Sequence, residues 1–168
     1  MEKIREAARV AKEMNANPPA SNQPVYNALA RNVEDEVMPA CAENGMGLVV
    51  FSPLAQGILT GKYVPGQAPP EGSRGGDDKS NMFMKDLMTD EILGKVQRLK
   101  TLVEASGATV AQFALAWCLR RPEVSSVIIG ASRPEQVDEN VKASGLELPL
   151  QVWEEAEQIF GDDTRHGF

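Results

Sequence analysis

The stretch SSVIIGASRPEQVDENV, residues 125–141, begins as a strand and continues as a helix. A β-branched run stops at Gly130, and Ser132 then stands where the N-cap of a helix is expected. Pro134 is favourable in a first helical turn, and Glu135 follows Ser132 by three residues, as in a capping box. The sequence therefore predicts a strand, a short connection and a helix with a well-specified start.

The start of this helix also has features that favour anion binding. Free N–H groups and the helix dipole attract negative charge, and Gly130 and Ala131 are small enough to let a phosphate approach the backbone. Gln136, Glu139 and Asn140 share one helix face, which could contact a nucleotide. The alternative is a capped surface helix whose polar face meets only water, and this stretch alone leaves both interpretations open.

The composition indicates one domain. With 168 residues and 42% hydrophobic content, the chain is long enough to bury about 70% of the surface that its unfolded form exposes. It has 17 Lys and Arg against 24 Asp and Glu, a formal net charge of −7, and no basic stripe interleaved with aromatic residues. Nucleic acid is therefore not an expected partner.

The two cysteines do not indicate a metal site. Cys41 and Cys118 lie within predicted helices, far apart and without the spacing of metal ligands, so we expect small buried side chains in a reducing compartment. The N-terminal MEKIREAARV is charged and amphipathic, and no run approaches membrane-spanning length. The sequence predicts a cytoplasmic protein without a metal ion or a membrane span.

Helices alternate with extended segments along the chain. Apolar residues at helical spacing predict helices over residues 2–14, 33–44, 90–105, 109–120 and 148–160. Extended segments are expected in ASNQPVYN (20–27), where Pro24 indicates a strand end, in GLVVFSPL (47–54), and in the stretch that begins at residue 125. This order is typical of an α/β fold with a parallel sheet and covering helices.

Three groups of residues are expected at one rim of this sheet. Ligands of parallel sheets lie at the carboxyl ends of the strands, and here those ends carry Gln23, residues 51–54 and residues 130–132. The segment from Ala55 to about Met82 is rich in Gly, Pro, Ser and Asp and is longer than an ordinary connection. We expect it to form a lid.

The chain contains four segments, SNQPVYN, FSPLAQGILTGKY, FALAWCLRRPEVSSVIIGAS and SRPEQVDENV, that resemble, in the same order, segments of the aldo-keto reductases. The resemblance covers residues 2 to about 160 and is greatest to the branch that includes the potassium-channel β subunits. It implies an NADP(H)-dependent TIM-type (β/α)8 barrel, of which this chain would supply the sixth to eighth strands, their helices and a C-terminal helix. We therefore expect residues 1–160 to form a partial barrel on the cofactor-binding side and residues 161–168 to form a polar tail.

The resemblance also implies a set of NADP(H) contacts. Gln23 would contact the nicotinamide end, and Phe51 would stack on the nicotinamide ring. The other implied contacts are Ser52, Pro53, Leu54 and Gln56 at the pyrophosphate, Lys62 and Arg74 from the closing loop, Gly130, Ser132 and Gln136 at the 2′-phosphate region, and Glu139 and Asn140 at the adenine. Arg133 either adds charge at the 2′-phosphate or points to solvent.

Each of these positions also has an ordinary structural explanation. Gln23 could end a strand, Phe51 could belong to the core, and the loop cations Lys62 and Arg74 could be solvated surface charges. Four similar segments in order favour the family interpretation.

The family's catalytic set has no match in these segments. In aldo-keto reductases a Tyr donates a proton to the carbonyl, its pKa lowered by a Lys, with an Asp and a His completing the set, and all four come from the first half of the barrel. The one histidine here, His166, lies in the tail, and Tyr26 and Tyr63 lie in cofactor-side segments. We therefore expect no catalytic residue and no turnover in this chain alone.

Three functions follow from this expectation. The chain could be the NADP(H)-binding half of an enzyme that reduces aldehydes and ketones by hydride transfer once a complementary N-terminal half completes the barrel. It could instead be a regulatory module that holds NADP(H) without turnover. The third alternative is a truncated chain that associates with a second copy, because three strands leave two sheet edges unpaired.

Overall fold

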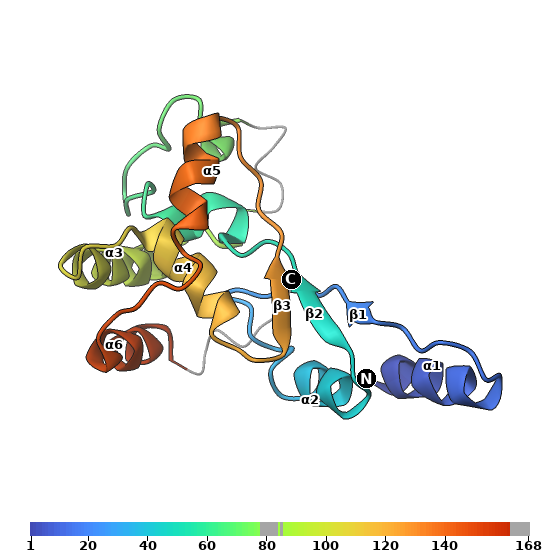
Figure 1. Cartoon of the computed structure of the whole chain (residues 1–168). Helices are drawn as coiled ribbons and strands as arrows, with labels where there is room; N and C mark the ends of the chain where they lie inside the picture. The colour runs from blue at the N-terminus through green and yellow to red at the C-terminus, as the bar shows by residue number, and fades with distance from the viewer. Residues whose placement is uncertain (78–83, 85, 162–168) are drawn as a thin grey trace.

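The computed structural model describes residues 1–77, 84 and 86–161, whose elements Figure 1 shows in chain order. They are α1 (Glu2–Glu13), β1 (Ser21–Asn22), α2 (Val37–Glu43), β2 (Gly47–Val50), the 3₁₀ helices η1 (Ala55–Thr60) and η2 (Arg74–Gly76), α3 (Asp90–Glu104), α4 (Val110–Leu119), β3 (Val124–Val127), α5 (Pro134–Val141) and α6 (Leu150–Phe160). The expected alternation of helices with three strands is confirmed. The expected tail beyond residue 161 lies outside the described residues.

One predicted helix starts later than expected. Residues 33–36 form turns, and α2 begins only at Val37. The backbone of Glu36, at φ −135° and ψ −43°, is outside the helical region, and Glu34 is held by an ion pair with Arg31 at 3.0 Å. The prediction of a helix from residue 33 was therefore wrong, because side-chain bonds fix this turn before the helix starts.

The sheet is open and parallel, with the strand order β1-β2-β3. Ser21 pairs with Gly47, and Leu48 pairs with Val124. Leu48 and Val50 are fully buried in a cluster that includes residues of α2 and α4, whereas the alternate positions of β2 are only partly buried. A Cβ at Gly47 would lie 2.2 Å from Ser125 Oγ, so a larger residue here would force the Ser125 side chain to turn away.

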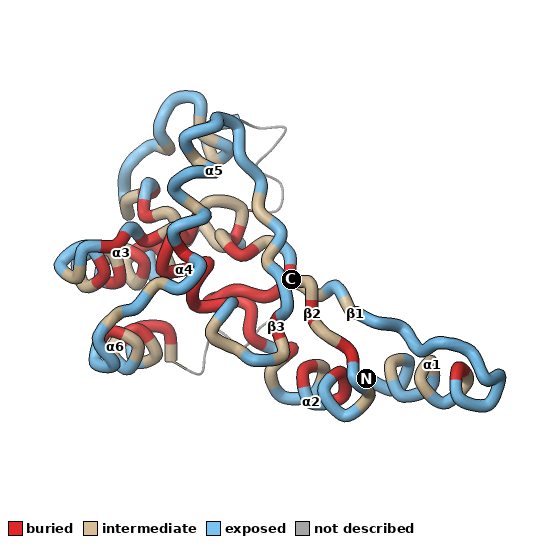
Figure 2. The backbone as a smooth tube through the Cα atoms, in the orientation of Figure 1, coloured by how far each residue is buried: buried red, intermediate tan, exposed pale blue. Residues whose placement is uncertain are grey.

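The larger core lies between α3, α4 and α6 and includes the segment around η1. Trp117 of α4 is fully buried, and its indole lies 5.7 Å from the Phe113 ring and 6.1 Å from the Phe160 ring, between centroids. The Arg120 guanidinium lies 3.5 Å from the centroid of the same indole, a cation–π contact. Figure 2 shows the buried course of α4 and the exposed course of α5.

Two helices lie at the periphery of the described structure. α1 buries only Ala11 and lies at the far end from α3 and α6 (Figure 1), with Arg5 paired to Glu43 of α2 at 3.1 Å. α5 has no buried residue.

Cys41 and Cys118 are fully buried free thiols, which confirms the expectation that both are buried. Burial raises the pKa of the Cys118 thiol to about 12.

Candidate functional site

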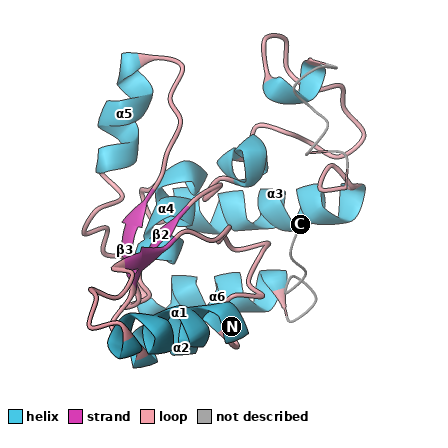
Figure 3. Cartoon of the chain, turned by 90° about the vertical axis from the view of Figure 1, so that its right-hand side faces the viewer, coloured by secondary structure: helices cyan, strands magenta, loops and turns pink. Residues whose placement is uncertain are grey.

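An open cleft of about 970 Å³ lies where β2 and β3 end. Its walls come from the end of β2, from the loop that runs through η1 and η2, from the start of α4, and from the connection between β3 and α5 together with α5 itself. In Figure 3, α5 and the loop containing η2 lie on opposite sides of the molecule's upper part. The cleft therefore brings together segments that are up to about 90 residues apart in the chain.

The structure gathers most of the residues singled out in the sequence around this cleft. Of the thirteen expected contact residues, twelve line it: Phe51, Ser52, Pro53, Leu54, Gln56, Lys62, Arg74, Gly130, Ser132, Gln136, Glu139 and Asn140. Gln23 does not line it. That residue is exposed just after β1, whose pairing to β2 continues through a bridge between Val25 and Phe51.

The backbone at the end of β2 adopts a rare conformation. Ser52, Ala55 and Gln56 have φ values of 55°, 45° and 59°, which is the left-handed region that non-glycine residues seldom occupy. Asn27, which is fully buried, supports this turn, because its side-chain amide donates to the Ser52 carbonyl at 2.9 Å. Such conformations persist where the surrounding structure fixes them, and they concentrate at binding sites.

Phe51 presents an aromatic face beside this turn. Its N–H donates to the Pro24 carbonyl at 3.1 Å, and its carbonyl accepts from Tyr26 N–H at 3.3 Å, so the backbone is fixed by the neighbouring strand. The residue is 37% exposed and lines the cleft. Phe51 is therefore not a core residue, and its ring is available for stacking.

Polar side chains connect the loop to the end of β2. Arg74 donates to Gln56 Oε1, and Gln56 Nε2 donates to Ser52 Oγ at 3.1 Å. Lys62 lies on the same side, with its Nζ 5.2 Å from the centroid of the Tyr63 ring. Two cations thus line this wall of the cleft, where an anion would find charge-assisted hydrogen-bond donors. Residues 78–82 of the expected lid lie outside the described residues.

Tyr63 and Gln97 hold this loop in place. The sequence did not predict this role for either residue. The Tyr63 hydroxyl accepts a hydrogen bond from Gly75 N–H at 3.1 Å, and a Cβ at Gly75 would lie 2.7 Å from the Tyr63 ring. Gln97 Nε2 donates to the carbonyls of Gly61 at 3.0 Å and Tyr63 at 2.8 Å. These bonds join residues 12 to 36 positions apart, a range at which local sequence patterns give no signal.

The start of α5 differs from the sequence expectation. Its N-cap is Arg133, no side chain caps the helix, and Pro134 is the first helical residue as expected. The N–H and hydroxyl of Ser132 both donate to Gln136 Oε1, at 2.7 and 3.2 Å. The predicted capping box of Ser132 and Glu135 was wrong, because Gln136, one residue further along, reaches back to the chain before the helix.

The other end of α5 is bound to α4. Gln112, which also completes a capping box with Thr109 at the start of α4, donates from Nε2 to the Glu139 carbonyl and to Glu139 Oε2, at 3.2 and 3.1 Å. Glu139 Oε1 accepts from Lys142 Nζ at 2.6 Å. Arg133 is exposed and lines the same wall. This wall therefore combines a cation, amides and a carboxylate.

The two tyrosines of the cofactor-side segments do not line the cleft. Tyr26 is fully buried and donates to Glu34 Oε1 at 2.7 Å, and burial raises the pKa of its hydroxyl well above the ordinary value, opposed by the nearby Arg121. Tyr63 is 1% exposed, and its hydroxyl holds the loop at Gly75. His166, noted in the sequence, lies outside the described residues.

Within residues 1–77, 84 and 86–161, no three His, Cys, Asp or Glu side chains are grouped so as to hold a metal ion. In the same part of the chain, no helix combines the length and the apolar character needed to cross a membrane.

Comparison with known proteins identifies the family. The sequence model of the Aldo/keto reductase family matches residues 1–160. The chain is 42% identical over 150 residues to a probable voltage-gated potassium channel subunit beta of Arabidopsis thaliana, covering 89% of this chain and 45% of that protein. A protein of the same description from Oryza sativa subsp. japonica is 39% identical over 159 residues, covering 94% of this chain and 48% of that protein.

A reductase is also among the relatives. L-glyceraldehyde 3-phosphate reductase of Escherichia coli (strain K12) is 38% identical over 123 residues, covering 73% of this chain and 36% of the reductase. The chain thus spans less than half the length of these three relatives. Its open parallel sheet is consistent with part of a (β/α)8 barrel. The family match over nearly all of its length shows that this chain belongs to the aldo/keto reductase family, and that it resembles the potassium-channel β subunits within it.

Proposed function

We propose that this chain binds NADP(H) in the cleft and supplies the cofactor-binding part of an oxidoreductase that reduces aldehydes or ketones. One observation carries the proposal. A single cleft joins an exposed aromatic ring, the cations Lys62, Arg74 and Arg133, and the polar face of α5. An aromatic face, phosphate-binding donors and a polar wall are the three features that a dinucleotide with an additional phosphate requires.

Each wall has a role in this proposal. Phe51 stacks against the nicotinamide ring, and Lys62 and Arg74 neutralise the pyrophosphate beside the end of β2. On the opposite wall, Ser132, Arg133 and Gln136 meet the 2′-phosphate near the start of α5, where the positive end of the helix dipole favours an anion. Gln23 would approach the nicotinamide end from the neighbouring strand. The bound cofactor would supply the hydride.

Carbonyl reduction also needs a proton donor beside the reacting oxygen. Tyr26 and Tyr63 are both buried outside the cleft lining, so neither is suited to that step. We propose that the proton donor comes from residues that these 168 do not include, either in a complementary half of the barrel or in a longer chain. A cytoplasmic location fits the proposal, because reduced free thiols such as Cys41 and Cys118 are maintained there.

A titration of the purified 168-residue chain with NADPH tests the binding, followed by fluorescence quenching and thermal shift, with NADH for comparison. We expect NADPH to stabilise the chain more than NADH, because charge at the 2′-phosphate gives the added affinity. Gln136→Ala should weaken NADPH binding by about five- to tenfold through the loss of its polar contacts. Gln151→Ala, on the exposed face of α6, is the matched control and should leave binding unchanged. The absence of any NADPH-dependent shift would contradict the proposal.

A second function, NADP(H) binding without turnover in a regulatory assembly, is favoured by the identity to proteins described as potassium channel β subunits. Both functions require the same cleft, so binding alone does not separate them. NADPH consumption in the presence of small aldehydes does. We expect none from the chain alone, and consumption after adding a separately produced N-terminal half of a relative would favour the enzyme over the regulatory module.

A further inference from the structure

The helix that carries three of the proposed nucleotide contacts is held to the rest of the molecule with little burial. α5 contributes Gln136, Glu139 and Asn140 to the cleft, yet none of its eight residues is buried. Apolar packing is the usual way to fix a helix, and here Val137 and Val141 are 44% and 63% exposed. Specific polar bonds must therefore fix the position of α5.

The side chain of Gln112 makes the polar contact between α4 and α5. It is only 7% exposed, although amides of this size are mostly found at the surface. Its Oε1 accepts from Thr109 N–H at 3.0 Å, which fixes the orientation of the amide. Both Nε2 contacts are with Glu139: one with the main-chain carbonyl at 3.2 Å and one with Oε2 at 3.1 Å. Gln112 therefore holds both the backbone and the side chain of Glu139.

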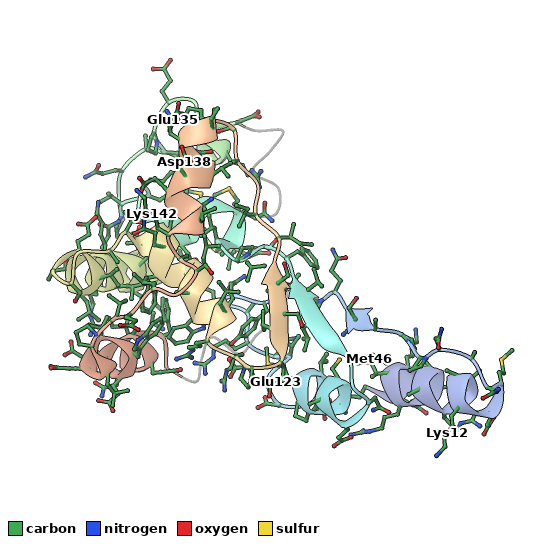
Figure 4. The ribbon with its side chains drawn as sticks, in the orientation of Figure 1. Lys12, Met46, Glu123, Glu135, Asp138 and Lys142 are labelled. Carbon is green, nitrogen blue, oxygen red and sulfur yellow. The ribbon has the colours of Figure 1, made fainter. Side chains whose placement is uncertain are left out.

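The Glu139 carboxylate is bound on two sides. Gln112 donates to Oε2, and Lys142 donates to Oε1 at 2.6 Å. Figure 4 shows Lys142 at the end of α5 nearer α4, with Asp138 and Glu135 toward the start of the helix, farther from α4. An ionised carboxylate has about four acceptor positions and no donor, so the remaining positions of Glu139 accept hydrogen bonds only. A base that carries an amino group would be favoured there over one that carries a carbonyl.

We propose that Gln112 is a positioning residue: it fixes Glu139 at the rim of the cleft and thereby sets the preference for an amino-bearing base in the bound nucleotide. The preference rests on the proposed binding of NADP(H). The positioning itself is a property of the chain without a ligand, so it can be tested separately.

Gln112→Glu is the variant that isolates this role. A glutamate preserves the capping box with Thr109, because its carboxylate still accepts from the Thr109 N–H. It removes both donors to Glu139 and places a second carboxylate against the first, which is unfavourable where both are ionised. The double variant Gln112→Glu with Glu139→Gln restores the side-chain donor and acceptor with the partners exchanged, but not the hydrogen bond to the main-chain carbonyl of residue 139. Lys142→Ala is the matched control, since it removes the exposed partner of the same carboxylate.

The first measurement is hydrogen exchange of the α5 amides in the ligand-free chain. We expect exchange about tenfold faster in Gln112→Glu, a partial return toward the rate of the unmodified chain in the double variant, and less than a threefold change in Lys142→Ala. Far-UV circular dichroism checks that the total helix content of each variant equals that of the unmodified chain. Unchanged exchange in Gln112→Glu, or an equal effect of Lys142→Ala, would overturn the positioning role.

The second measurement compares the dissociation constants of NADPH and of its hypoxanthine analogue, in which a carbonyl replaces the adenine amino group. We expect the unmodified chain to prefer NADPH by about tenfold, Gln112→Glu to lose most of that preference, and the double variant to regain only part of it, because the amide introduced at position 139 carries donors as well as an acceptor. A variant that was merely destabilised would weaken both nucleotides equally, and that result would refute the inference about base preference. If the unmodified chain binds neither nucleotide, the proposed function and the base preference fail, while hydrogen exchange still decides whether Gln112 positions α5.

Discussion

The neighbouring helices α4 and α5 differ in how the fold holds them. Eight of the ten residues of α4 are buried, among them Phe113 and Trp117, whereas none of the eight residues of α5 is. A hydrogen-bonded pair, Gln112 and Glu139, joins the two. The buried helix α4 supplies stability, whereas the proposed ligand contacts come from the exposed helix α5. α4 is fixed by apolar burial, and α5 keeps its polar side chains at the cleft because it takes little part in the core.

The strongest test of this division is Trp117→Ala. The substitution removes a fully buried indole that contacts the rings of Phe113 and Phe160 and the Arg120 guanidinium. We expect it to lower the free energy of unfolding by about 3–5 kcal/mol, measured by urea denaturation, because the cavity cannot collapse within a packed core. A loss below about 1 kcal/mol would mean that α4 is not the centre of the core.

The next test concerns the ion pairs at the C-terminal end of α4. Glu34 accepts from Arg31 and Tyr26, at 3.0 and 2.7 Å, and from Arg121, which follows α4, at 2.8 Å. Burial acts to raise the pKa of the Glu34 carboxyl, but these partners hold it below its ordinary value. We expect Glu34→Gln to cost about 1–3 kcal/mol of stability at neutral pH, since it leaves Arg31 with one ionic partner fewer in a buried position.

The pH dependence of that loss has a defined sign. A carboxyl whose pKa is lowered by folding stabilises the folded state above the unfolded pKa, and this contribution disappears as the pH falls through the folded-state value. The difference between the unmodified chain and Glu34→Gln should therefore be full at neutral pH and shrink below the ordinary carboxyl value of 4.5. Chemical denaturation at a series of pH values measures it. Glu135→Gln, the same substitution at an exposed position of α5, is the control.

Local patterns in the sequence predicted the elements and the part of the cleft at the strand ends. Helical spacing located α3, α4 and α6 to within two residues at each end, because their apolar faces repeat regularly. The strand ends predicted residues 51–54 and 130–132 at one rim, and these residues line the cleft, since parallel strands end at one edge. Periodicity and chain order were sufficient for both predictions. Gln56, Lys62 and Arg74 were instead expected from the resemblance to the aldo-keto reductases, and they line the same cleft.

The bonds that position the site were beyond the reach of such patterns. Asn27 supports the turn at Ser52 from 25 residues away, and Gln112 reaches Glu139 across 27 residues. In the sequence, Gln112 cannot be distinguished from any other polar residue in the first turn of a helix, because nothing local indicates a distant partner. The cap of α5 was misassigned for a related reason, because both Glu135 and Gln136 are suitable in type and only the folded backbone selects Gln136.

The smallest expected effect is that of Val137→Ala on α5. Val137 is 44% exposed, so little buried apolar area is lost, and alanine has the higher helix propensity by about 0.5 kcal/mol. The free energy of unfolding should change by less than about 0.5 kcal/mol, and NADPH affinity by less than about twofold, because Val137 does not line the cleft. Urea denaturation and the NADPH titration measure the two quantities.

A larger loss of stability would show that a partner surface covers this face of α5 in solution, and the contrast between the two helices would then hold only for the isolated chain. A concentration-dependent unfolding midpoint would identify that partner as a second copy, since dissociation would precede unfolding.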